Sequence, residues 1–132
     1  MTGNWTVDSA GTWAAPGMQV LPEVSLIARR YGIDLTRHRS KPVTETILAA
    51  HDLILVMETG HREALQNEFP ACEEHIYLLS QVVEERTYDI PDLIDSVETI
   101  SEVGENLHRL IHTGFTGICR LATRLARRSQ SI

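Results

Sequence analysis

Two cysteines, Cys72 and Cys119, are the side chains of this 132-residue sequence best suited to nucleophilic chemistry. A cysteine that attacks phosphorus commonly lies in a loop of the form Cys-x5-Arg. The backbone amides of this loop and the guanidinium of its arginine hold the bound phosphate and lower the pKa of the cysteine thiol. The sixth residue after Cys72 is Leu78, and the sixth after Cys119 is Leu125. These residues therefore encode no such loop.

Other chemical motifs are also missing from these residues. The sequence contains no Gly-x-Ser-x-Gly elbow, no Walker loop and no Gly-x-Gly-x-x-Gly turn. His108 and His112 are four residues apart, which places both on one helix face, but no carboxylate stands at a spacing typical of zinc sites. We therefore expect no metal and no cofactor.

Two loops hold candidate polar groups. Asp92 lies in an acidic stretch, where it is either a solvated carboxylate or a general acid that protonates a leaving oxygen. The run from Asp8 to Trp13 follows a short β-rich segment and is typical of a loop at a strand end. Each loop needs a rigid element behind it to position its side chains.

The first half of the chain predicts one strand and two helices. A strand is expected near 4–9, followed by a loop over 11–21 that is rich in glycine and proline. Pro22 suits the first position of a helix, and Gly32 suits its left-handed end. Thr44 is expected to cap a short helix that runs through Ala50.

The second half predicts two buried strands and three helices. The apolar run 52–57 is typical of a strand covered on both faces of a parallel sheet, and 76–79 is a second, shorter strand. Thr59 is expected to cap a helix over 60–68, and Ser80 to open a brief one. The last helix is predicted over about 97–127, with the apolar stripe Leu107, Leu110, Ile111, Gly114, Ile118, Leu121 and Leu125.

This alternation of strands and helices predicts an α/β fold in three layers, with a mostly parallel sheet flanked by helices. Residues 1–132 have the length of a single domain. Ligands of such sheets bind beyond the carboxyl ends of the strands. Here those ends lead into Ser9–Trp13, Met57–His61 and the loop that reaches Asp92.

The composition narrows the possible partners and compartments. A net charge of −6 argues against nucleic-acid binding, and no apolar run is long enough to span a membrane. No secretory leader is visible, and two widely separated cysteines do not make a disulfide framework. We therefore expect a cytoplasmic protein with reduced thiols.

Four segments in order resemble the low molecular weight protein tyrosine phosphatase family. They are Val7-Asp-Ser-Ala-Gly-Thr-Trp13, Gly32-Ile-Asp-Leu-Thr-Arg-His38-Arg-Ser40, Asp52-Leu-Ile-Leu-Val-Met57 and Tyr88-Asp-Ile-Pro-Asp92. Each is weak alone, but their order and spacing agree with the family along nearly the whole chain. The resemblance implies a flavodoxin-like, four-stranded parallel sheet.

The resemblance also implies an activity and site residues. The family reaction is hydrolysis of phosphotyrosine through a cysteinyl-phosphate, without a metal or cofactor, on a phosphorylated protein or a small phosphate ester. Asp92 matches the general acid, Ser9 matches the serine that hydrogen-bonds the phosphate loop, and Trp13 lies near an aromatic wall of the substrate cleft. Leu93 and Ile94 stand where the family has a proline and then an aromatic or similar residue. Without the proline the loop is less rigid, so the direction of the Asp92 side chain is less constrained.

A larger departure lies before Ser9. Family members begin with a strand, the Cys-x5-Arg-Ser loop and a helix, and these 132 residues contain no such unit. We expect a truncated family member, incomplete at the N-terminus, whose chain is inactive alone. Because the missing strand is central in the family's sheet, two further outcomes are open. Either the strand near 4–9 shifts to pair with the strand at 52–57, or the opened edge recruits a partner, including a second copy of the chain.

Two alternatives to an incomplete phosphatase remain open. The chain is either a non-catalytic binding or oligomerisation module on a degenerate phosphatase scaffold or, with less support, a protein similar to arsenate reductases. The lack of a second cysteine near Cys72 weighs against the reductase. Arsenate turnover with a thiol donor would support it.

Overall fold

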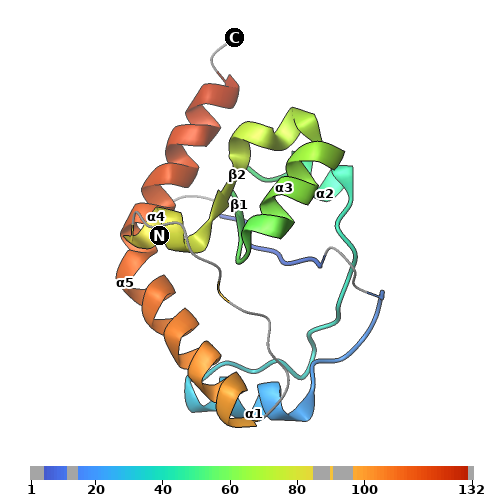
Figure 1. Ribbon diagram of the computed structural model, residues 1–132, viewed down its shortest axis with the longest axis vertical. Helices are drawn as coiled ribbons and strands as arrows, with labels where there is room; N and C mark the ends of the chain where they lie inside the picture. The colour runs from blue at the N-terminus through green and yellow to red at the C-terminus, as the bar shows by residue number, and fades with distance from the viewer. Residues whose placement is uncertain (1–4, 12–14, 85–89, 91–96, 131–132) are drawn as a thin grey trace.

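The computed structural model describes residues 5–11, 15–84, 90 and 97–130 of the chain (Figure 1). In chain order its elements are α1 (Pro22–Arg30), α2 (Glu45–Ala49), β1 (Ile54–Val56), α3 (Thr59–Glu68), the 3-10 helix η1 (Pro70–His75), β2 (Ile76–Leu78), α4 (Leu79–Glu84) and α5 (Val97–Gln130). Among these residues, no helix has both the length and the apolar character needed to cross a membrane.

The two strands form a parallel pair in the register Ile54↔Ile76, Leu55↔Tyr77 and Val56↔Leu78. Because side chains alternate along a strand, successive residues of β1 contact different cores. Ile54 and Val56 pack against a cluster formed by α2, α3, η1 and β2, whose buried members are Leu48, Leu65, Cys72 and Ile76.

The opposite face of the sheet is covered by α4 and α5. Leu55 and Met57 pack there against a second cluster, whose buried members are Leu79, Ile90 and Leu110. Helices therefore lie on both faces of a parallel sheet, which confirms the predicted three-layer α/β architecture.

Helix α1 packs against α5 rather than against the sheet, and it lies at the opposite end of the molecule from β1 and β2 (Figure 1). The approach is close at Gly104, where a Cβ added to the glycine would lie 3.3 Å from Cγ2 of Ile27. Pro22 occupies the first turn of α1 and Gly32 has φ +74°, as the sequence predicts for the two ends of this helix.

Helix caps show where local sequence decides structure. The side-chain oxygen of Thr44 accepts a hydrogen bond from the N–H of Ile47 at 3.2 Å, so the predicted cap of α2 is confirmed. The expected cap at Thr59 is wrong by one position, because Glu58 is the N-cap of α3 and Thr59 is its first helical residue.

The predicted strand near 4–9 is wrong for the residues that the structure describes there. Residues 5–10 are irregular, and only Gly11 makes an isolated parallel bridge, to Pro42. A β-rich sequence forms a strand only when a neighbouring strand satisfies its backbone, and the described sheet contains β1 and β2 alone. The described sheet is thus smaller than the four strands implied by the family resemblance.

Candidate functional site

The backbone bridge at Gly11 fixes the segment that carries Ser9. The N–H of Gly11 donates to the carbonyl oxygen of Lys41 at 3.0 Å, and the N–H of Val43 donates to that of Gly11 at 3.1 Å. These two bonds place residues 8–11 beside the connection that leads into α2, so side chains far apart in sequence meet here.

Ser40 ties the same connection to the loop before α1. Its backbone N–H donates to the carbonyl oxygen of Met18 at 2.8 Å, and its side-chain oxygen accepts from the N–H of Met18 at 3.0 Å. Its hydroxyl also donates to the carbonyl oxygen of Ala15. The loop that frames the site is therefore held by side-chain and backbone bonds rather than by a sheet.

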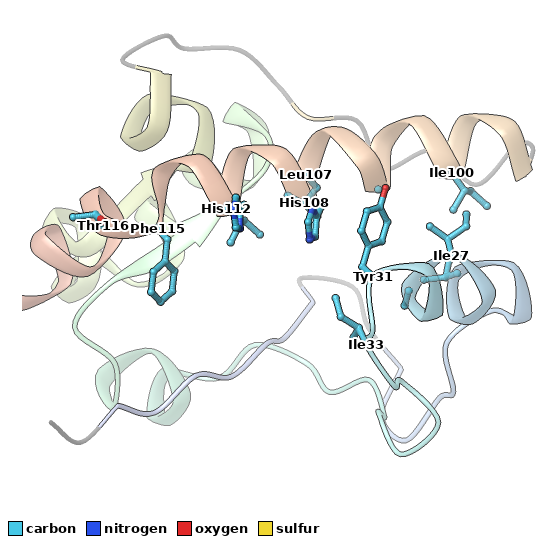
Figure 2. A pocket seen from close by; sticks show the side chains of 13 residues that line it. Ile27, Tyr31, Ile33, Ile100, Leu107, His108, His112, Phe115 and Thr116 are labelled. Carbon is cyan, nitrogen blue, oxygen red and sulfur yellow. The ribbon is translucent and has the colours of Figure 1, made fainter. Parts of the chain in front are cut away.

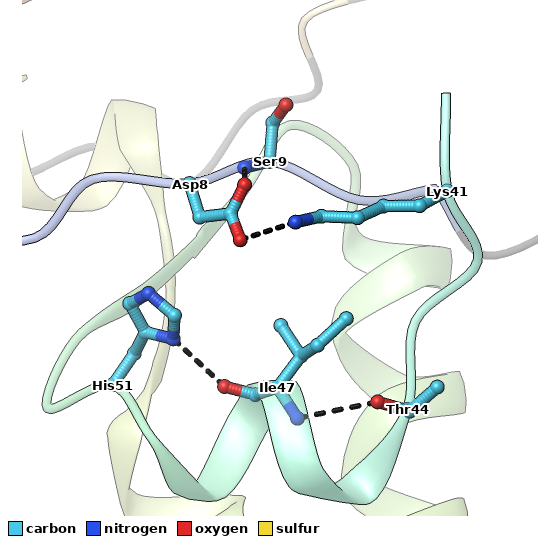
Figure 3. Close-up of polar contacts among 6 residues, drawn as sticks. All are labelled: Asp8, Ser9, Lys41, Thr44, Ile47 and His51. Atoms are coloured by element: carbon cyan, nitrogen blue, oxygen red, sulfur yellow. Dashed lines mark hydrogen bonds and ion pairs between the residues drawn. The ribbon is translucent and has the colours of Figure 1, made fainter. Parts of the chain in front are cut away.

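Asp8 and Lys41 form an ion pair across this junction (Figure 3). The pKa of the Asp8 carboxyl is lowered from its ordinary value of 3.8, first by the hydrogen bond from the Lys41 ammonium and then by the backbone N–H of Ser9, which donates to Oδ1 at 2.9 Å. The positive charge of Lys41 and, to a smaller degree, His51 lower it further. A carboxylate beside Ser9 therefore stays ionised through the neutral range.

Ser9 is exposed, and its hydroxyl points to the side of the backbone away from Ile47 and His51 (Figure 3). Trp13 and Asp92, the other two predicted site residues, lie outside the described residues. The roles assigned to all three stay predictions.

Ile90 is the described residue within the acidic stretch that contains Asp92. Its side chain is buried, and its N–H donates to the carbonyl oxygen of Met57 at 2.8 Å. This bond holds the residue two positions before Asp92 against the carboxyl end of β1. Ile90 thus lies at the carboxyl end of β1, where the topology predicts a ligand site.

His51 is a feature that the sequence reasoning missed. Its Nδ1 lies 2.7 Å from the carbonyl oxygen of Ile47, and its Nε2 is buried with no hydrogen-bond partner among the described residues. Because the Ile47 oxygen can only accept, Nδ1 is the donor in this hydrogen bond. The available signal was its position, directly before the apolar run that becomes β1.

These groups surround a cavity of about 950 Å³. Residues 8–11 line one side of it, β1 lines another, and α2 and α5 complete the walls through apolar side chains, among them Ile47, Leu48, Leu107 and Ile111. Asp8, Ser9, His51 and His61 are polar residues of the same lining.

The two cysteines lie elsewhere. Cys72 is buried in the core cluster beside α3, and Cys119 is half-buried on α5. Both are free thiols, and neither lines the cavity beside β1. Within the described ranges, no three His, Cys, Asp or Glu side chains come close enough together to hold a metal ion.

Known proteins resemble this chain in sequence. It is 30% identical over 87 residues to a probable low molecular weight protein-tyrosine-phosphatase, EpsP of Ralstonia nicotianae, a match that covers 66% of this chain and 58% of the relative. It is 28% identical over 86 residues to a protein-arginine-phosphatase of Geobacillus stearothermophilus, covering 65% of this chain and 57% of the relative. The chain thus spans less than three fifths of the length of these curated relatives.

The fold agrees with these matches. The solved structure of the YwlE arginine phosphatase from Geobacillus stearothermophilus superimposes with a TM-score of 0.76 at 25% sequence identity, over 93% of this chain and 75% of that one. The family model described as low molecular weight phosphotyrosine protein phosphatase matches residues 2–128. This chain therefore belongs to the low molecular weight phosphotyrosine protein phosphatase family.

Proposed function

We propose that these 132 residues form the scaffold and rim of a site that hydrolyses phosphate monoesters, and that they do not turn over substrate alone. Neither Cys72 nor Cys119 is followed by an arginine at the sixth position, and neither lines the cavity beside β1. This observation carries the proposal, because the family reaction needs a thiolate beside the bound phosphate.

The reaction proposed for a complete site has two displacements. In the first, a cysteine thiolate attacks phosphorus, the bond to the leaving oxygen breaks, and Asp92 gives that oxygen its proton. In the second, water attacks the cysteinyl-phosphate, and the Asp92 carboxylate takes a proton from that water. Inorganic phosphate leaves, and the thiolate is regenerated.

Ser9 and Trp13 are assigned to the rim in this proposal. A hydroxyl at Ser9 can hydrogen-bond a phosphate-binding loop, and an indole at Trp13 can lie along an aromatic leaving group. Phosphotyrosine is the proposed substrate class, although relatives include a named arginine phosphatase. Two free thiols in the described structure support a reducing compartment, so we place the protein in the cytoplasm.

The test is turnover of p-nitrophenyl phosphate and of a phosphotyrosine peptide by the 132-residue protein, beside Cys72→Ala, Cys119→Ala and Asp92→Asn. We expect no release of phosphate above the buffer rate from any of the four proteins. Turnover that disappears in either cysteine variant would overturn the claim that the chain is inactive alone.

A non-catalytic binding or oligomerisation module is the second candidate. Supporting it, β1 is the edge of the described sheet and borders a large, mostly apolar cavity. Sedimentation velocity tests it through the oligomeric state. A well-folded monomer at all concentrations would count against self-association.

A further inference from the structure

The carboxyl-terminal part of α5 carries a positive charge on a protein that is acidic as a whole. From residue 106 to residue 132 the sequence has five arginines and no aspartate or glutamate. The other seven of the 12 lysines and arginines and all 18 acids lie in residues 1–105, so that region carries −11 against +5 for the rest. The chain is therefore divided into two regions of opposite charge.

Arg120 and Arg124 are exposed on this part of α5. Within the part of the chain that the structure describes, neither side chain forms an ion pair. Arg109 differs from them, because its Nη1 lies 3.9 Å from Oε1 of Glu84 and its Nη2 donates to Oδ1 of Asn106 at 2.5 Å. Arg120 and Arg124 thus hold charges that the described residues leave unmatched.

The helix dipole does not explain these two arginines. Helix α5 ends at Gln130, and the dipole stabilises a cation within about the last turn of a helix. Arg127 and Arg128 stand in that turn, whereas Arg124 is six residues and Arg120 is ten residues before the end. Their charges require another cause.

The spacing of the arginines is unfavourable for the helix itself. Arg120 and Arg124 are four residues apart, and so are Arg124 and Arg128. Residues at this spacing are neighbours on a helix surface, where like charges destabilise the helix about as much as opposite charges stabilise it. No acid stands three or four residues from Arg120 or Arg124 in the sequence. An anion bound across the two arginines would offset their repulsion.

The two arginines lie on a different side of α5 from the inner hollows of the molecule. A hollow of about 550 Å³ lies between α1 and α5, and His108 and Phe115 point into it (Figure 2). Ile111 lines this hollow and also the cavity beside β1. Arg120 follows Ile111 by nine residues, about two and a half turns, so the two lie on opposite sides of the helix.

The surface beside Arg120 is open to a second chain. One turn earlier on the helix are Thr116 and Gly117, and both are exposed. A Cβ added to Gly117 would meet nothing within 4 Å. The end of α5 also lies at one extremity of the molecule (Figure 1). A second polypeptide can therefore reach the two arginines without displacing a side chain of this one.

We propose that the basic face of α5, defined by Arg120 and Arg124, binds an acidic segment of another protein. Carboxylates of that segment accept hydrogen bonds from the two guanidinium groups, which present pairs of N–H donors suited to a carboxylate. Four residues span about 6 Å along a helix, so the segment needs carboxylates about 6 Å apart. The small side chains at Thr116 and Gly117 leave room for its backbone.

Other polyanions fit this face less well. A nucleic acid or an anionic membrane spreads negative charge over a wide area and would also meet the region that carries −11. A helix that lies in a membrane surface uses large apolar side chains, whereas the exposed neighbours of Arg120 on this side are Thr116, Gly117 and Thr123. A short acidic segment can occupy the basic face alone.

The probe is a fluorescent peptide of about four Glu-Ala-Ala-Ala repeats, and the control peptide has glutamine in place of every glutamate. Binding to the 132-residue protein is measured by fluorescence anisotropy. We expect the affinity of the glutamate peptide to fall about tenfold between about 20 mM and about 300 mM salt. At the lower salt concentration, the glutamine peptide should bind at least about tenfold more weakly than the glutamate peptide.

Arg120→Glu separates binding from folding. It replaces a like-charge pair with Arg124 by an opposite-charge pair in the favourable order, so Tm should rise by about 1–4 °C. The same change should weaken binding of the glutamate peptide at least about tenfold. Arg29→Glu is the matched control, because Arg29 is exposed in the last turn of α1 and the charge changes equally. Its affinity for the peptide should stay within about twofold of the parent.

Three results would overturn the proposal at the basic face. They are equal binding of the two peptides, equal affinity of Arg120→Glu and the parent for the glutamate peptide, and a lower Tm for Arg120→Glu. The last result would show that Arg120 supports the helix itself rather than a partner.

Two further measurements test the kind of occupant. Tighter binding to vesicles with about 30% phosphatidylserine than to the glutamate peptide would overturn the assignment in favour of a lipid surface. A salt-sensitive dimer of the parent protein that is lost in Arg120→Glu would assign the face to acidic residues of a second copy instead. None of these measurements follows phosphate release, so the proposal fails or holds independently of the proposed function.

Discussion

Gly114 of α5 lies so close to Val83 of α4 that no side chain fits between them. A Cβ built on Gly114 would be 2.5 Å from Cγ2 and 2.8 Å from Cγ1 of Val83. It would also lie 3.0 Å from Cβ of Val83, so rotation of the two methyl groups leaves the branched carbon itself too close. Val83 also packs in the cluster that covers one face of the sheet, so this contact fixes how closely α4 approaches α5.

Gly114→Ala should therefore destabilise the protein. Alanine improves helix propensity by about 1 kcal/mol, but overpacking at a site of this kind costs about 1–3 kcal/mol. We expect a net loss of stability in urea unfolding followed by circular dichroism. Val83→Ala in the Gly114→Ala background should recover part of that loss, because it removes the two clashing methyl groups.

Gly117→Ala is the matched control on the same helix. A Cβ there meets nothing within 4 Å, and Gly117 is exposed. Only the gain in helix propensity then acts, because no overpacking opposes it. The free energy of unfolding should rise by about 0.5–1 kcal/mol. If both substitutions stabilise the protein equally, the contact between Gly114 and Val83 does not limit the packing of α4 on α5.

Sequence reasoning succeeded where one short stretch decides its own structure. The run around Ile54 was apolar on both faces and forms β1, while the stripe through Leu110 belongs to α5. The cap at Thr44 and the left-handed Gly32 needed only local information.

Reasoning failed where structure depends on a distant partner. Residues 5–9 have a β-rich composition, but no described strand lies beside them, so the predicted strand is absent there. The ion pair between Asp8 and Lys41 and the unpaired Nε2 of His51 join positions that no periodicity relates. A single sequence does not reveal such encounters.

Leu110→Ala should be among the most damaging substitutions on α5. Leu110 is 1% exposed and is a buried member of the cluster that includes Leu79 and Ile90. Removing its three outer carbons leaves a cavity and should cost about 2–5 kcal/mol in the free energy of unfolding.

Ile111→Ala is the neighbouring comparison, since Ile111 is 41% exposed and lines the cavity beside β1. The loss in the free energy of unfolding should be smaller, about 1 kcal/mol, because less apolar surface returns to water. Thermal unfolding of the two variants at one protein concentration measures the difference. Equal losses would mean that the α5 face at Ile111 is covered in solution.

The ion pair with Lys41 predicts a specific pH dependence at Asp8. The pKa of Asp8 is lowered in the folded protein, so the pair stabilises the fold above the ordinary value of 3.8. That stabilisation is lost as the pH falls through the lowered pKa. In a carboxyl NMR titration, Lys41→Met should raise the pKa of Asp8.

Asp34 is the internal control for that titration. Its pKa is also lowered, but by the backbone N–H and the hydroxyl of Thr36, and the N–H lies 2.9 Å from Oδ1. Lys41→Met should leave the pKa of Asp34 unchanged. Movement of both carboxyl groups together would point to a general change in the fold rather than to the loss of one ion pair.

The two cysteines should differ in their rate of alkylation. Cys72 is 8% exposed in the core beside Leu65, whereas Cys119 is half-buried on α5. Reaction at Cys72 requires opening of that core, and the open fraction of a stable domain is on the order of 10⁻³ or less. Under native conditions we expect iodoacetamide to modify Cys119 at least about 100-fold faster than Cys72, as followed by mass spectrometry.

In concentrated urea the two alkylation rates should become equal, which controls for the intrinsic reactivity of the two thiols. Equal native rates would show that the cluster around Cys72 opens readily, and a thiol there would then be accessible to chemistry after all.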